Sequence, residues 1–129
     1  MFDHVGLSVQ DVDASARFYE AALEPLGCVL CFRDAASAGF GPVAAPALWL
    51  YRAAGAGGTA AVAPPARTHV ALRARDRAAV EAFYKRGLEA GGRDHGAPGL
   101  RADYSPSYFA AFLLDPDGNN VEAVCTSAS

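Results

Sequence analysis

Residues 4–27 read HVGLSVQDVDASARFYEAALEPLG, and residues 69–92 read HVALRARDRAAVEAFYKRGLEAGG. At this offset of 65 residues, ten of the 24 aligned positions are identical, and no gap is needed. The identities include the first His, an Asp, a Phe-Tyr pair and the last Gly. Such agreement indicates an internal duplication in which each copy is one supersecondary unit.

Each copy is predicted to begin as a strand and to continue as a helix. Large apolar residues alternate at the start, which is typical of a strand with one buried face. These residues are Val5, Leu7 and Val9, and then Val70, Leu72 and Ala74. Aspartates follow at helix N-cap positions, either Asp11 or Asp13 in the first copy and Asp76 in the second. The Phe-Tyr pair belongs to the apolar stripe of the helix, and the closing glycines end it.

Three further strands are expected in each half. Their ranges are about 27–33, 38–41 and 47–52 in the first half, and about 92–94, 108–114 and 119–125 in the second. The sequence Asp-Pro-Asp-Gly at 115–118 predicts a tight turn before the last strand. Residues 96–107 predict a long loop of the kind that closes over sites.

The length of 129 residues fits one domain, residues 1–129. Within it we expect a first pseudo-repeat at about 1–54 and a second at about 67–129. Residues of about 55–66, which are mostly Ala, Gly and Pro, are interpreted as the linker.

Composition excludes several function classes. A net charge of −3 gives no attraction to nucleic acid or to an anionic membrane, and no apolar run is long enough to span a bilayer. The N-terminus lacks a signal segment, so a cytoplasmic protein is expected. Three cysteines fit a reducing compartment, and Cys28, Cys31 and Cys125 are interpreted as buried or half-buried thiols rather than redox or zinc ligands. No phosphate-binding loop or nucleophile elbow is present in the sequence.

Strand alternation predicts which side chains share a face. The core-facing residues point to the helices, so His4, His69 and Glu122 are expected to point the other way. They share one inner surface, lined by Trp49 and Tyr51, if the two units fold their sheets around a common axis. Two imidazoles and one carboxylate form a facial set that leaves open positions on a divalent ion such as Fe(II) or Mn(II). The alternative for a single histidine at a strand start is an ordinary surface or core residue.

Other polar residues are candidates for the same pocket. Tyr104 and Tyr108, in or beside the long loop, bind or protonate a chelated substrate in one interpretation and pack the loop edge in the other. Arg73 shares the inner face and would meet an anionic substrate, with a salt bridge at the rim as its alternative. His95 is interpreted as a solvated surface residue.

The doubled pattern H-V-x-L…D…F-Y…L…G and the ending FLLDPDGNNVE at 112–122 resemble the vicinal oxygen chelate superfamily. Its members include glyoxalase I, extradiol dioxygenases, fosfomycin-resistance thiol transferases and bleomycin-resistance proteins. The resemblance covers essentially the whole chain. It implies an α+β fold of two tandem βαβββ modules that form a cupped mixed sheet with helices on the outer face, and a homodimer.

The resemblance also implies a metal site. Its ligand positions correspond to His4, His69 and Glu122, holding a divalent ion (Fe, Mn, Zn or Ni), with a fourth position at Trp49. Tryptophan cannot ligate a metal, and no Glu, Asp, Gln or His lies between Asp34 and His69. The glyoxalase I activity, which uses a fourth ligand, is therefore disfavoured.

Two functions remain open at this point. The first is a metal-dependent lyase, dioxygenase or transferase that chelates vicinal oxygens of a small molecule. The second is a non-catalytic protein that binds a drug or aromatic ligand in a trough of Trp49, Tyr51, Tyr104 and Tyr108. An oligomeric scaffold ranks third because no recognition motif supports it.

Overall fold

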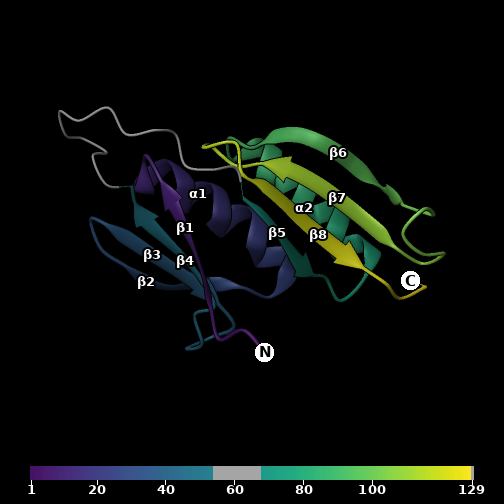
Figure 1. The fold of residues 1–129 in the computed structure, drawn as a ribbon, viewed down its shortest axis with the longest axis horizontal. Helices are drawn as coiled ribbons and strands as arrows, with labels where there is room; N and C mark the ends of the chain where they lie inside the picture. Colours follow the sequence, from purple (N-terminus) through teal and green to yellow (C-terminus); the bar gives the residue numbers. More distant parts are fainter. Residues whose placement is uncertain (54–67, 129) are drawn as a thin grey trace.

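The computed structural model describes residues 1–53 and 68–128, so the predicted linker at about 55–66 lies outside the described residues. The same order of elements occurs twice along the chain (Figure 1). The first set is β1 (Val5–Val9), α1 (Val12–Leu23), the 3₁₀ turn η1 (Glu24–Leu26), β2 (Val29–Arg33), β3 (Ser37–Gly41) and β4 (Leu48–Arg52). The second set is β5 (His69–Arg73), α2 (Arg77–Glu89), β6 (Arg93–Leu100), β7 (Phe109–Leu114) and β8 (Asn120–Cys125).

The strands form two mixed four-stranded sheets of identical topology. Their orders are β1-β4-β3-β2 and β5-β8-β7-β6. In each sheet the first strand pairs in parallel with the last strand of its module, and the remaining pairs are antiparallel. The predicted pair of βαβββ modules is confirmed.

The helices begin where the sequence predicts. Asp11 caps α1 by accepting a hydrogen bond from the Ala14 amide at 3.0 Å, which decides between Asp11 and Asp13. Asp76 caps α2 in the same way through the Ala79 amide at 2.8 Å. The two helices pack against each other, and each also packs on its own sheet. The faces of the sheets turned away from the helices are therefore left for a site.

The prediction for the strand after α2 was wrong. Instead of ending at residue 94, β6 continues to Leu100, so it takes five residues from the predicted loop and includes His95. β6 lies at the edge of its sheet, and its pairing shifts register on both sides of Gly96. An irregular edge strand tolerates glycine and proline, the residues that favoured a loop. The other strands end at the predicted residues and begin within two residues of them.

The turn before β8 connects the two modules. Tyr19 of α1 is fully buried and donates a hydrogen bond from its hydroxyl to Asp115 Oδ2 at 2.7 Å. The carboxylate of Asp117 accepts from the Gln10 amide at 3.0 Å and from the Ser15 hydroxyl at 3.4 Å. Asp115 is itself fully buried. The turn thus fixes the position of α1 relative to the second sheet.

The remaining sequence expectations concern cysteines and membranes. Cys125 is buried in the core, and Cys28 and Cys31 are half-buried free thiols, as predicted. No helix in the described part of the chain is long and apolar enough to cross a membrane.

Candidate metal centre and ligand pocket

Strand register confirms the predicted face of the second sheet, whereas the predicted grouping of His4 with His69 and Glu122 does not form among the described residues. In the second sheet His69 pairs with Asn120, and Ala71 pairs with Glu122, so these side chains share one face. That face is opposite to the one formed by Val121 and Ala123, which belong to the core.

His69 and Glu122 are in direct contact. His69 Nε2 lies 2.9 Å from Glu122 Oε2, and His69 Nδ1 lies 2.8 Å from Asn120 Nδ2. The Tyr108 hydroxyl donates to the other oxygen, Glu122 Oε1, at 2.5 Å. The Glu122 side chain is only 4% exposed, whereas that of His69 is 50% exposed. The contact therefore joins a buried carboxylate to a half-exposed imidazole.

The phenol of Tyr108 is strongly affected by this contact. Its hydrogen bond to Glu122, followed by burial and the negative charge of Glu122, raises the pKa of Tyr108 to about 12. Tyr108 therefore keeps its proton at neutral pH and acts as a donor to the carboxylate. The ring of Tyr104 packs edge-on against Tyr108, with centroids 5.1 Å apart.

One unsatisfied atom bears on metal binding. Asn120 Oδ1 is buried without a hydrogen-bond partner, next to an amide nitrogen that faces His69 Nδ1. If the amide rotates by 180°, Oδ1 accepts a hydrogen from Nδ1, and the lone pair of His69 Nε2 then faces Glu122 Oε2. Metal-bound histidines are commonly oriented in this way by an acceptor on the second ring nitrogen. His69 and Glu122 thus fit two ligands of one divalent ion.

His4 does not join them within this chain. It precedes β1 in the other module, is half exposed, and its Nδ1 lies 2.7 Å from Asp3 Oδ1. In Figure 1, β1 runs upward from beside the N-terminus and β5 runs downward, so the two strands begin at opposite ends. Within residues 1–53 and 68–128, no three His, Cys, Asp or Glu side chains are grouped closely enough to hold one metal ion.

A pocket opens beside His69 on the same face. Its volume is about 440 Å³, and it is lined by His69, His95, Gly96, Arg101, Tyr104, Phe112 and Asn120. A neighbouring pocket of about 330 Å³ shares His69, His95 and Asn120 with it. His95 is exposed, as interpreted from the sequence, and it also lines both pockets.

Sequence reasoning missed two residues of this pocket, Phe112 and Arg101. Phe112 pairs with Glu122 across the sheet, and its ring centroid lies 6.3 Å from that of His69. Alternation along β7 from Tyr108 would have placed Phe112 on the inner face. Arg101 follows the irregular strand β6, where no periodic pattern indicates a direction.

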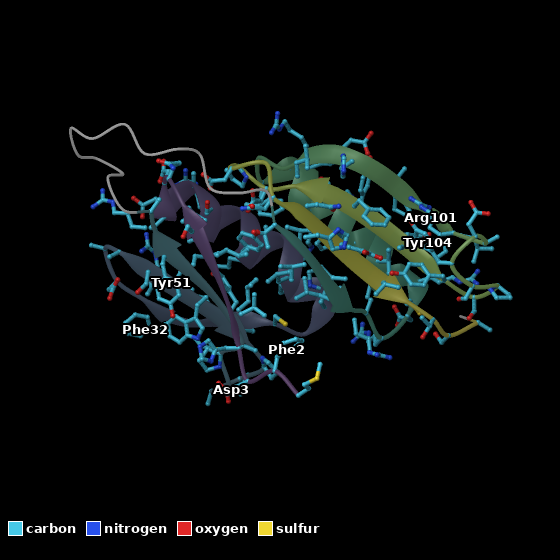
Figure 2. All side chains as sticks on the ribbon, viewed as in Figure 1. Phe2, Asp3, Phe32, Tyr51, Arg101 and Tyr104 are labelled. Carbon is cyan, nitrogen blue, oxygen red and sulfur yellow. The ribbon has the colours of Figure 1, made fainter. Side chains whose placement is uncertain are left out.

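The first sheet presents aromatic rings instead. Trp49 and Tyr51 stack with centroids 6.2 Å apart and planes within 12°, and Phe32 lies 5.6 Å from Trp49. A Cβ on Gly39 would lie 2.9 Å from the Trp49 ring, and one on Gly6 would lie 2.9 Å from the Tyr51 ring. The two glycines thus let the rings lie close to the sheet. Figure 2 shows Phe32 and Tyr51 on the first module, away from Arg101 and Tyr104.

Arg73 lines a different cleft. This cleft, of about 390 Å³, separates the edge strands β1 and β5 and is mostly apolar, with Val5, Leu48, Val70 and Leu72 among its lining residues. Arg73 therefore does not line either pocket next to His69.

Solved structures share this fold. A glyoxalase/bleomycin resistance protein from Albidiferax ferrireducens T118 matches with a TM-score of 0.76 and 26% identity, covering 96% of this chain and 97% of that one. A glyoxalase-related enzyme from Fulvimarina pelagi matches with a TM-score of 0.70, 22% identity and coverage of 96% and 86%. Lactoylglutathione lyase from Agrobacterium tumefaciens matches with a TM-score of 0.64, 20% identity and coverage of 96% and 92%. At these last two identities the likeness concerns the fold alone.

No curated protein sequence matches the chain. The family model described as Glyoxalase/Bleomycin resistance protein/Dioxygenase superfamily matches residues 1–123. Because that match takes in both modules and the DPDGNN turn, the chain belongs to the glyoxalase/bleomycin resistance protein/dioxygenase superfamily.

Proposed function

We propose that this protein is a metal-dependent enzyme that chelates two neighbouring oxygens of a small-molecule substrate. The observation that carries the proposal is the contact between His69 Nε2 and the buried Glu122 carboxylate, with Asn120 placed to orient the imidazole. A buried carboxylate needs a compensating positive charge or strong hydrogen bonds. The Tyr108 hydroxyl already donates to Oε1, and a divalent ion shared with His69 would supply positive charge at Oε2.

In this proposal His69, Glu122 and Tyr108 have different roles. When bound, the ion acts as a Lewis acid that stabilises negative charge developing on substrate oxygens. His69 and Glu122 would hold the ion, and the half-exposed His69 side chain lines the pocket where a substrate would lie. Tyr108 keeps a proton on its hydroxyl and donates it in a hydrogen bond to Glu122 Oε1, which fixes the carboxylate.

The third ligand in this proposal is His4 of a second copy of the chain. His4 is exposed and does not reach His69 within its own chain, while β1 and β5 both have an unpaired edge among the described residues. In a twofold dimer, the first module of each copy meets the second module of the other and forms two equivalent sites.

Metal analysis after purification tests the ligand set. We expect about one divalent ion per chain in the wild type, and loss of the ion in His4→Ala, His69→Ala and Glu122→Ala. His95→Ala is the matched control, because His95 is the remaining histidine of the chain and is not in the ligand set. Unchanged metal content in the His69 and Glu122 variants would sink the proposal.

Coexpression of His4→Ala with Glu122→Ala tests the two-copy arrangement. In a mixed dimer one site carries both substitutions and the other carries neither. Random pairing therefore restores about a quarter of the wild-type metal content. If each site forms within one chain, coexpression restores none.

A second function is favoured by the aromatic face of the first module. Trp49 and Tyr51 are stacked and Phe32 is tilted beside them, and these partly exposed rings suit a flat aromatic ligand without any metal. Trp49 is the only tryptophan of the chain, so its fluorescence reports on this face directly. Thermal stabilisation by aromatic ligands that is indifferent to a chelator supports binding alone, whereas a melting temperature that drops with the chelator supports the metal enzyme.

A further inference from the structure

The guanidinium of Arg101 is held over the pocket without an acidic partner. It lies above the Phe112 ring, with Cζ 5.4 Å from the ring centroid, and Nη2 donates to the Ala97 carbonyl at 2.7 Å. Arg33, Arg75 and Arg86 each form an ion pair with a carboxylate, whereas Arg101 forms none with the residues that the structure describes. Figure 2 shows Arg101 next to Tyr104 on the second module.

The backbone around Arg101 is also fixed. The Arg101 amide donates to the Tyr108 carbonyl at 2.7 Å, which closes the neck of the loop between β6 and β7. The Arg101 carbonyl accepts from the Tyr104 amide at 2.9 Å inside that loop. These backbone bonds fix the start of the Arg101 side chain, and the bond to the Ala97 carbonyl fixes its guanidinium.

Two glycines of β6 make room for the guanidinium. A Cβ on Gly99 would lie 3.1 Å from Arg101 Nη1, and one on Gly96 would lie 3.3 Å from Nη2. Arginine has five N–H donors, and the Ala97 carbonyl takes one of them. The remaining donors are available to a ligand in the pocket that also contains His69.

We propose that Arg101 is a specificity-determining residue that binds a carboxylate of the substrate, next to the oxygens that reach His69 and Glu122. The inference rests on the proposed function only in using the same pocket. A planar guanidinium matches a carboxylate through two parallel hydrogen bonds. Phosphate sites commonly add a helix N-terminus, and the lining of this pocket includes no residue of α1 or α2. The substrate class is therefore a small carboxylic acid.

Binding of benzoate, benzamide and phenyl phosphate, followed by NMR titration of chelator-treated protein, tests the inference. The chelator removes any contact between an ion and the carboxylate. We expect benzoate to bind about tenfold to a hundredfold more tightly than its neutral analogue benzamide, the range for a charge-assisted hydrogen-bonded pair. Arg101→Gln is expected to abolish this preference.

Matched variants keep the test decisive. Arg93→Gln removes an arginine from the neighbouring pocket and is expected to keep the preference for benzoate. Arg101→Lys serves as a second variant in case Arg101→Gln fails to fold. It keeps the positive charge but loses the two parallel N–H donors of the guanidinium, so benzoate binding is expected to weaken several-fold. Equal binding of benzoate and benzamide, or a preference that survives both Arg101 substitutions, overturns the inference. An Arg101-dependent preference for phenyl phosphate overturns the carboxylate class.

Metal content measured on each preparation before the chelator is added separates the two proposals. A bound ion together with no benzoate preference overturns the role of Arg101 and leaves the metal site standing. An Arg101-dependent preference in a protein that never binds an ion overturns the metal enzyme and leaves the carboxylate site standing.

Discussion

Removal of one hydroxyl, in Tyr19→Phe, is expected to destabilise the protein by breaking one buried hydrogen bond between the modules. The lost bond runs from the Tyr19 hydroxyl to Asp115 Oδ2 at 2.7 Å, and both residues are fully buried. A hydrogen bond to a charged group contributes about 1.5–3 kcal/mol. Asp115 keeps other donors, namely the Asp117 amide and the amide and side chain of Asn119. We therefore expect a loss near the lower limit, about 1.5–2 kcal/mol.

Urea unfolding measures this loss as a lower midpoint with an unchanged slope, a shift of roughly 1 M for a protein of this size. Tyr84→Phe is the matched control, because Tyr84 is the equivalent residue of the second copy and its hydroxyl bonds to Asp94 near the surface. The control is expected to lose much less. Equal losses in the two variants, or no loss in Tyr19→Phe, would refute the role of the buried hydroxyl.

Three further predictions concern the site, the pH dependence and the packing. Glu122→Gln is expected to lower the pKa of Tyr108 from about 12 towards its ordinary value of 10.0, as followed by NMR of labelled tyrosine; an unchanged pKa would mean that Glu122 is not the cause. Burial raises the pKa of Asp117 above 3.8, so the folded state holds that proton more tightly than the unfolded state. The stability of the wild type relative to Asp117→Asn should therefore fall as pH rises from 3.8 through the folded pKa, and a rise would contradict this. Gly87→Ala places a Cβ 2.2 Å from Leu113 Cδ1, so calorimetry should show about 1–3 kcal/mol of destabilisation, whereas a more stable variant would show that α2 has room.

Much of the fold was predictable because its signals are local. The alternation of Val5, Leu7 and Val9 and the capping aspartates depend on neighbours within one turn or one strand, and the repeat shows the same local signals twice. The same alternation predicted that His69 and Glu122 share a face, and they lie in contact.

What the sequence did not predict depends on longer-range geometry. The separation of His4 from His69 follows from how the two modules pack, and no spacing along the chain encodes that arrangement. The extension of β6 and the position of Arg101 depend on register shifts around Gly96. In the sequence, a glycine at such a position favours the prediction of a loop. The alternation along β7 could have placed Phe112 on the inner face, but Phe112 was not among the predicted pocket residues.

The bond between Tyr19 and Asp115 also bears on how the duplicated chain evolved. The two halves began as equivalent units, but the buried donor now belongs to the first and its acceptor to the second. The corresponding turn of the first half, residues 42–47, reads PVAAPA and carries no carboxylate. Separating the halves would leave the Tyr19 hydroxyl without its acceptor, whereas Asp115 would keep the donors of its own turn. The first half therefore depends on the second for a buried hydrogen-bond partner that its own turn does not supply.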